Sequence, residues 1–448
     1  MSLFSYRDYR HLFAAQVVAL FGTGLTTVAL SLLAYQLAGA DAAAVLGTAL
    51  TIKMIAYVTV APIAAAYADR VPRRLMLVGL DLIRATVVVA MPFIDQVWHI
   101  YLLIALLQTA SAAFTPTFQA VIPDVVTDES DYTQALSASQ LASTMESLLS
   151  PVLAALALTV MSFHWLFAGT VVGFLLSAAL VVSSRIPNAT PNNRGNIWER
   201  TAAGIRIFAA TPRLRGVLAL DLVVAGCGSI VMVTTVNYVR DALGRPQADV
   251  AWLLAASGTG TMIIALALPP ILHRISERPV MLCGAAVLLI GATSAVALST
   301  TSGAHQWGEA IALWWLIGAG MSLILTPVGR VLRRSAAPPD RPAIFAAQFS
   351  LSHLCWLLTY PIAGWGATLL GFTTTWTILA GIAAAGAITA IFAWPRHDPE
   401  EIAHTHDTAT TSDDHLTHDA TPLGDGVFEH AHTFMIDQDH LRWPEPTK

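Results

Sequence analysis

The chain has 448 residues, of which 55% are hydrophobic and 12% are charged, and its mean hydropathy is +0.62. An average soluble protein carries roughly a quarter charged residues, so this composition excludes an ordinary soluble domain and indicates a protein of the lipid bilayer. The formal net charge of −5 averages two unlike regions, because residues 396–448 hold 12 acidic and three basic residues, whereas the preceding body is net positive.

Apolar runs follow one another along the body, and each can cross ~30 Å of hydrocarbon as a helix. The first run follows Arg7 and Arg10 and shows no convincing cleavage site, so we expect it to be retained as a helix and not removed as a signal peptide. We predict an all-α integral membrane protein with about twelve transmembrane helices. The runs cover residues 12–37, 44–68, 75–94, 98–122, 133–160, 164–184, 216–239, 248–272, 279–300, 309–329, 343–370 and 373–394.

Basic residues fix the expected orientation. If each run crosses the membrane, successive loops lie on alternate sides of it. In this arrangement, 17 of the 21 Lys and Arg residues of the body lie on one side. Only Arg240 and Arg245 lie on the other side. Since cytoplasmic loops carry the excess of Lys and Arg, both termini are expected to be cytoplasmic and the protein to lie in the cell (inner) membrane.

The longest break between runs divides the predicted helices six and six. Both halves carry a short basic loop after their second helix, at 69–74 and 273–278, and a proline in their fifth helix, Pro151 and Pro361. Duplicated six-helix bundles are typical of carriers, because two rigid halves can rock about a central site. The expected domains are an N-terminal bundle (1–184), a cytoplasmic linker (185–215), a C-terminal bundle (216–395) and a cytoplasmic His-rich tail (396–448). Within the linker, residues 197–209 are expected to form a short amphipathic helix.

Ionisable side chains inside the predicted helices are candidates for the transport pathway. A charge at mid-bilayer costs ~2.5 to 3.5 kcal/mol on insertion scales, so such residues are functional candidates by default. Glu146 can take up and release a proton there, although a structural salt bridge or hydrogen-bonded carboxylate is the alternative. Asp221 is either a gate or a solvated anchor near the cytoplasmic surface. The pathway candidates are Lys53, Glu146, Asp221 and His353, with the uncharged Gln108 and Asn237 as expected parts of the cavity wall.

Charged residues also cluster near the predicted cytoplasmic ends. Asp81 and Arg84 are three residues apart on one helix face and are expected to pair. Asp69 ends one helix, and Arg73 and Arg74 begin the next, so a carboxylate and a guanidinium can pair across the turn and hold one arrangement of the bundles. Simple anchoring by the positive-inside rule is the alternative for the arginines.

The segment 61–74 (APIAAAYADRVPRR) resembles the loop signature of the major facilitator superfamily. Together with 81–85 (DLIRA) and 6–13 (YRDYRHLF), it is similar to the branch of the enterobactin exporter and macrolide-efflux carriers. The resemblance implies efflux driven by protons or membrane potential, and contact between helices 2 and 11, which carry Lys53 and His353. It also implies a conformational latch at Asp69, Arg70, Arg73 and Arg74, supported by Asp81 and Arg84. At Thr23, Ala65 and Ser150 this sequence departs from the family's antiport and loop motifs. These departures bear on the proton-antiport mechanism more than on the fold.

Eight of the 14 histidines lie in the acidic tail, where low hydrophobicity and high charge predict a largely disordered chain. Imidazole is a favoured ligand of late divalent metals, so the tail is a candidate metal binder, and histidines incidental to a solvated tail are the alternative. The tail resembles the histidine-bearing C-termini of nickel- and cobalt-resistance exporters. Its segment 427–444 is less polar and is expected to dock on the cytoplasmic face. The candidate ligands are His404, His406, His415, His418, His430, His432 and His440.

We therefore expect a secondary active exporter whose partners are the bilayer, protons, and a divalent transition metal or an amphipathic drug or siderophore. Metal ligands available in the helices are Met54, Glu146, Cys227, His353 and Cys355. A metal sensor or scaffold that no longer transports is the alternative from another class. No phosphate-binding glycine loop, paired nucleophile and base, or complete metal motif is found, so we expect no enzyme activity, no nucleotide or nucleic acid partner and no required cofactor beyond metal bound by the tail.

Overall fold

The computed structural model describes most of the helical body and parts of the tail. The described residues are 3–67, 72–126, 135, 138–139, 142, 146, 150, 152–154, 156–186, 197–303, 305–336, 341–398, 401–407, 421–424, 427–436, 440 and 443.

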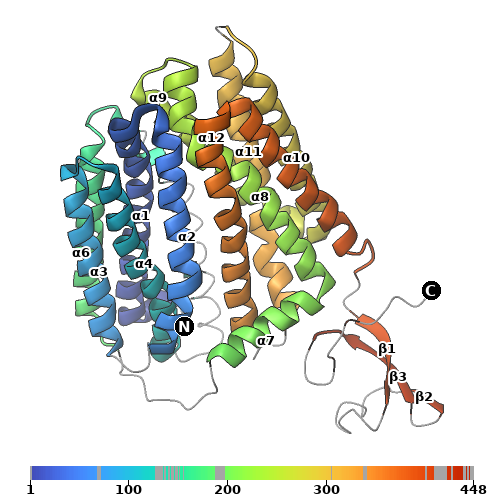
Figure 1. Ribbon diagram of the computed structural model, residues 1–448. Helices are drawn as coiled ribbons and strands as arrows, with labels where there is room; N and C mark the ends of the chain where they lie inside the picture. The colour runs from blue at the N-terminus through green and yellow to red at the C-terminus, as the bar shows by residue number, and fades with distance from the viewer. Residues whose placement is uncertain are drawn as a thin grey trace.

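Long helices pack side by side in two groups (Figure 1). The first group holds α1 (Arg7–Ala38), α2 (Ala42–Tyr67), α3 (Arg73–Ala90), α4 (Val97–Val125) and α6 (His164–Ser183). Described helical positions between 135 and 158 lie between α4 and α6 in the chain. The second group holds α8 (Pro212–Asn237), α9 (Gln247–Leu272), α10 (Glu277–Leu298), α11 (Gln306–Arg334) and α12 (Arg341–Ala393).

Two of the longest helical stretches turn back on themselves at glycine. A 3-10 turn, η2 (Gly39–Asp41), separates α1 from α2, and Gly39 has φ +55°. Inside α12, Gly371 has φ +79°, which interrupts the helix and divides it into two. Positive φ costs glycine little because it has no Cβ, so these positions set where the chain reverses.

The helices are long and apolar enough to cross a membrane. Within the described residues, nine continuous stretches meet this criterion, and two of them contain the turns at Gly39 and Gly371. Large apolar side chains point outward, with Phe392 83%, Leu369 71% and Leu266 66% exposed. Such a surface suits lipid, and helices satisfy there every backbone polar group internally. The chain is therefore a multi-pass membrane protein.

The two groups touch where α2 and α12 approach backbone to backbone. A Cβ atom added to Gly47 would lie 2.8 Å from both the Gly364 Cα and the Tyr360 carbonyl oxygen. A Cβ added to Gly364 would lie 2.5 Å from the Ala43 carbonyl oxygen. Small residues permit this close approach, which in membranes supplies van der Waals packing between helices.

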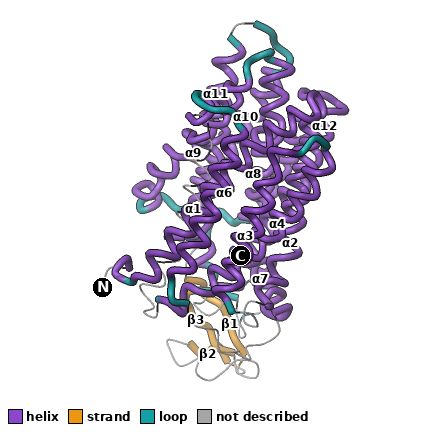
Figure 2. The backbone as a smooth tube through the Cα atoms, turned by 90° about the vertical axis from the view of Figure 1, so that its left-hand side faces the viewer, coloured by secondary structure: helices purple, strands orange, loops and turns teal. Residues whose placement is uncertain are grey.

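One end of the helical body carries α7 (Ile197–Ala210), the start of α1 and a small sheet, and we call it the tail end (Figures 1 and 2). The helix α7 lies where the sequence predicts a short amphipathic helix. It packs on α12 and α8, with Ile207 and Phe208 buried. Gly204 permits the contact, because a Cβ there would lie 2.3 Å from the Ala343 carbonyl oxygen.

The expectation of a largely disordered tail is wrong for three described segments. β1 (Glu401–Asp407), β2 (Thr421–Gly424) and β3 (Val427–Thr433) form a three-stranded antiparallel sheet in the order β1-β3-β2. The composition of a segment gives only its mean polarity, whereas a β-strand forms when a second strand is available to pair with it. Here β1 pairs with β3 along its whole length.

Candidate transport site

A small polar cavity of about 10 Å³ lies inside the first helix group. Its polar lining combines hydroxyls from α1, an ammonium from α2 and an amide and a hydroxyl from α4, and the rest is apolar. The polar lining residues are Thr23, Thr26, Thr27, Lys53, Gln108 and Ser111. The threonine hydroxyls donate to carbonyls one turn earlier, as in the 3.0 Å bond from Thr23 to Ala19, so their oxygen lone pairs remain available to the cavity.

A second cavity of about 80 Å³ adjoins the first, sharing Thr23 and Ser111 with it. It is lined on its polar side by Gln16, Tyr57, Arg84 and Thr115, with Phe114 and Phe118 among its apolar residues. We call the two cavities together the polar seam. Gln16 and Phe118 lie toward the tail end of α1 and α4, so the seam leads from Lys53 toward that end.

Among the described residues, Lys53 is the only cation that lines the first cavity. Its Nζ atom lies 5.8 Å from the centre of the Tyr57 ring, and no described carboxylate lies within ion-pair distance of it. The Glu146 carboxyl group interacts electrostatically with the Lys53 ammonium. The ammonium is therefore held inside the helical body without a bonded counter-ion among the described residues.

Glu146 lies on the segment between α4 and α6, half-buried against α1. A Cβ at Gly24 would lie 2.7 Å from the Glu146 Oε1 atom and 2.1 Å from the Ser150 hydroxyl oxygen. Gly24 thus leaves the space that Glu146 and Ser150 occupy. Glu146 and Lys53 influence each other electrostatically, although they form no ion pair.

The predicted pairing of Asp81 with Arg84 is confirmed. The two side chains form an ion pair inside α3, and the Ser177 hydroxyl donates to the other Asp81 oxygen at 2.7 Å. The Arg84 guanidinium also lies over the rings of Phe114, at 4.0 Å, and Phe174, at 4.5 Å. These contacts hold Arg84 in the wall of the second cavity.

The expected latch is described only in part. Asp69 and Arg70 lie outside the described residues, so the pairing across the turn stays a prediction. Arg73 is buried at the start of α3, and Arg74 donates a hydrogen bond to the Val182 carbonyl oxygen at the end of α6. Arg74 therefore ties two helices of the same group together.

Lys53 and His353 lie on α2 and α12, the two helices expected to meet, and Tyr57 lies between them. The rings of Tyr57 and His353 stack at 5.3 Å with an interplanar angle of 3°. His353 Nδ1 is 2.6 Å from the Phe349 carbonyl oxygen, an arrangement in which Nδ1 donates and Nε2 carries the free lone pair. Tyr57 is a site residue that the sequence analysis missed, because nothing distinguishes it from a lipid-facing aromatic.

Asp221 and Asn237, both on α8, lie outside the lining of the polar seam. Asp221 is buried and accepts a 2.8 Å hydrogen bond from the Gln348 amide of α12. Asn237, expected in the cavity wall, instead donates to the Ala40 carbonyl oxygen at 2.9 Å and to Asp241 at 2.8 Å. Asp241 in turn accepts a 2.5 Å bond from the Tyr35 hydroxyl, so these groups join the two helix groups at the end opposite the tail.

The candidate metal ligands of the helices do not converge. Within the described residues, no three His, Cys, Asp or Glu side chains are placed to hold a metal ion. Cys227 lies near the Leu288 carbonyl and Cys355 near the Leu351 carbonyl, both inside the second group. His415 and His418 of the tail lie outside the described residues, and His440 is buried against the Phe434 ring.

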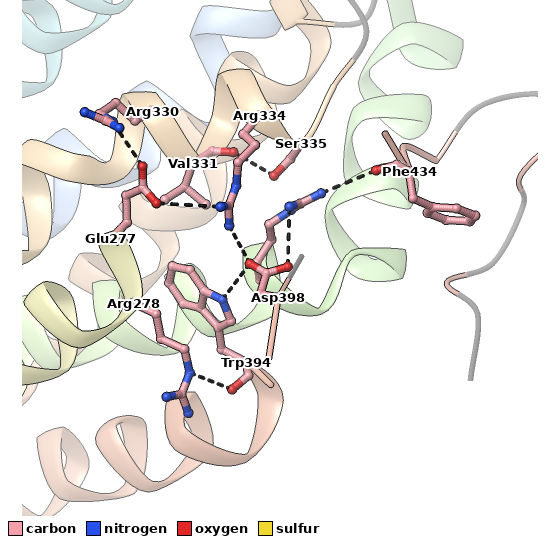
Figure 3. Close-up of polar contacts among 10 residues, drawn as sticks. Glu277, Arg278, Arg330, Val331, Arg334, Ser335, Trp394, Asp398 and Phe434 are labelled. Carbon is pink, nitrogen blue, oxygen red and sulfur yellow. Dashed lines mark hydrogen bonds and ion pairs between the residues drawn. The ribbon is translucent and has the colours of Figure 1, made fainter. Parts of the chain in front are cut away.

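A second cluster of charges occupies the tail end of the second group (Figure 3). Glu277 of α10 pairs with Arg330 and Arg334 of α11 at 3.0 and 3.8 Å. Asp398, just beyond α12, pairs with Arg334 at 2.5 Å and with Arg213 of α8 at 3.4 Å. Glu277 belongs to the basic loop at 273–278, whereas the other members of the cluster come from three other parts of the chain.

Comparisons with known proteins identify the fold. The family model of the Major Facilitator Superfamily matches residues 12–236 and 217–424, and the chain belongs to this superfamily of transporters. It is 24% identical over 358 residues to an uncharacterized MFS-type transporter, YfiS, of Bacillus subtilis (strain 168), covering 78% of this chain and 84% of the relative.

Solved structures share the same architecture. A D-xylose–proton symporter superposes with a TM-score of 0.66 at 15% identity, over 87% of this chain and 97% of the other. The nucleoside transporter NupG superposes with a TM-score of 0.65 at 14% identity, over 86% of this chain and 100% of the other. At such identity the likeness establishes the fold alone.

Proposed function

We propose that this transporter is a secondary active exporter that works by alternating access, with substrate bound in the polar seam and proton exchange at Glu146. The observation that carries the proposal is the Lys53 ammonium in the wall of a polar cavity, with the Glu146 carboxyl group as its electrostatic partner, inside an otherwise apolar helical body. Buried ionisable groups are costly in a membrane and are retained where they bind substrate or move protons.

The proposed topology has twelve crossings. The count comprises the two parts of α12, the separate α1 and α2, the other long helices, and the helix that the sequence predicts over 133–160. The two helix groups then correspond to the bundles 1–184 and 216–395, joined by 185–215. The arginines at the tail end support an orientation in the inner membrane in which that end and both termini face the cytoplasm.

The seam favours an amphipathic organic substrate with an anionic group over a divalent metal ion. Lys53 and the Gln108 amide can donate to an anion, and the apolar lining suits a hydrocarbon portion. A divalent metal needs carboxylate, imidazole or thiolate ligands, and the described lining holds an ammonium that repels it. Drug or siderophore export, with drug resistance as the phenotype, is therefore the leading proposal.

The proposal is tested by neutralising Glu146. Glu146→Gln keeps the shape of the side chain and removes the exchangeable proton, so uphill extrusion of a fluorescent amphipathic anion from energised vesicles should fall at least tenfold. Downhill exchange of the same dye should persist. Glu309→Gln removes an exposed carboxylate at the other end of the body and should leave both rates unchanged.

Unchanged uphill extrusion by Glu146→Gln would rule out Glu146 as the coupling residue. A wild-type protein that moves none of a broad panel of dyes, drugs and metals would instead favour the second candidate, a non-transporting metal sensor or scaffold. The tail sheet on the cytoplasmic side supports that candidate.

A further inference from the structure

The Gln108 side chain in the wall of the polar seam has an unused hydrogen-bond acceptor. Gln108 lies on α4, lines the first cavity and is only 7% exposed. Its Oε1 atom is buried and has no hydrogen-bond partner in the part of the chain that the structure describes. A buried acceptor in this state carries a desolvation cost that a donor brought by a ligand would remove. The first cavity therefore suits a ligand that supplies a hydrogen-bond donor.

The other polar groups of this cavity define what else the ligand must supply. The hydroxyls of Thr23, Thr26 and Thr27 donate to oxygen atoms of α1 or α6 at 2.9–3.1 Å, so their hydrogen atoms are already used. The Lys53 ammonium is a donor that forms no ion pair with a described carboxylate. A hydroxyl group can accept from Lys53 and donate to Gln108 at the same time, whereas a carboxylate can only accept.

The sizes of the two cavities favour the same group. The first cavity, of about 10 Å³, has room for about one water-sized group, and a hydroxyl is close to water in size and in hydrogen bonding. The second cavity, of about 80 Å³, is larger, and Phe114 and Phe118 in its wall suit an apolar portion. Since an ammonium has three N–H donors, Lys53 can serve the hydroxyl oxygen and an adjacent carboxylate together.

We propose that the first cavity is a hydroxyl-binding subsite and that the transporter selects anions with a hydroxyl group next to the carboxylate, which are 2-hydroxycarboxylates. Gln108 is then the residue that determines this preference, and Lys53 binds the charged group. This selectivity rests on the proposed function, because it takes the polar seam as the substrate site. It does not depend on proton exchange at Glu146.

The test compares two acids that differ by one hydroxyl, mandelate and phenylacetate. Calorimetric titration of the purified full-length protein in detergent gives the dissociation constant of each. The wild type should bind mandelate about tenfold more tightly, because only mandelate supplies a donor to Gln108. Gln108→Leu removes the amide at similar side-chain size, so the two dissociation constants should come within about twofold of each other, chiefly through weaker binding of mandelate.

A matched control removes a second amide from the same seam. Gln16 of α1 lines the second cavity, and its Oε1 atom already accepts a 2.6 Å hydrogen bond from the Ser139 hydroxyl. Gln16→Leu should therefore keep the wild-type ratio of the two dissociation constants, whatever its effect on overall affinity. The melting temperature of each variant shows whether it is folded, and the comparison of the two acids on the wild type does not depend on any variant.

Three outcomes would overturn this assignment: binding of neither acid by the wild type, equal affinity for both, or an unchanged preference for mandelate in folded Gln108→Leu. Failure of the proposed function gives a different result. Selective binding of mandelate by a wild-type protein that shows no uphill extrusion would contradict the exporter mechanism and retain the hydroxyl-binding subsite.

Discussion

Single residues give the polar seam its chemistry. Lys53 supplies an amino group, Thr23 lines both cavities, and Gly24 leaves room for Glu146. No described carboxylate forms an ion pair with the Lys53 ammonium. A bound anion would therefore offset part of the free-energy cost of holding this charge inside the membrane. The charge preference of the transporter should therefore depend on this one side chain.

Replacing Lys53 should change selectivity in a charge-dependent way. A hydrogen bond to a charged group contributes about 1.5–3 kcal/mol, so Lys53→Gln should raise the half-saturating concentration of an anionic amphiphile about 10- to 100-fold. A cationic amphiphile of similar size should be unaffected or better transported, and Lys53→Arg should retain much of the anion transport. Concentration series in everted vesicles measure these values, and an equal loss for both charge classes would contradict anion binding by Lys53.

Two of the described contacts between the helix groups are built from specific residues. The glycine contact between α2 and α12 packs backbone on backbone, while the Tyr35, Asn237 and Asp241 hydrogen bonds close the end opposite the tail. The stacked rings of Tyr57 and His353 continue the α2–α12 contact toward the tail end. A transporter that rocks must break some of these contacts in each cycle, so their strength sets the balance between its two states.

The glycine contact predicts a specific sensitivity. Gly364→Ala places a Cβ 2.5 Å from the Ala43 carbonyl oxygen, so α2 and α12 must separate, at a cost of about 1–3 kcal/mol. The melting temperature of the purified protein should fall by several degrees. Gly381→Ala, in the same α12 but with no atom within 4 Å of the new Cβ, should melt like the wild type. Identical melting of the two variants would show that the close approach is not maintained.

At the scale of the whole molecule, the tail end combines membrane helices with a folded appendage. The Arg213 guanidinium contacts Asp398, the Phe434 carbonyl and the Trp443 ring, which lies at 5.0 Å. These contacts connect the start of α8 to residues on both sides of the sheet. The position of the sheet is therefore coupled to the second helix group.

Loss of this anchor should release the tail. Arg213→Met removes the charge that holds both ends of the sheet, and a C-terminal epitope tag should be cleaved several-fold faster by a broad-specificity protease in detergent. Arg215→Met, an exposed arginine two residues away, should be cleaved at the wild-type rate. The time course of tag loss on immunoblots measures both rates, and equal rates would mean that Arg213 does not retain the tail.

The sequence by itself determined the membrane class, the positions of the long helices and the Asp81–Arg84 pair. Lipid allows only helices that satisfy their own backbone, and residues three apart in a helix must be neighbours, so local sequence suffices for these features. Only the tertiary structure decided that Lys53 and Gln108 line the same cavity, that Tyr57 stacks on His353, and that Arg213 contacts Asp398 and Phe434. Those contacts depend on the rotation of each helix about its axis and on which distant segments pair. Neither can be predicted from composition or local sequence pattern. The same reason explains the tail, where average polarity predicted disorder and the pairing of β1 with β3 produced a sheet.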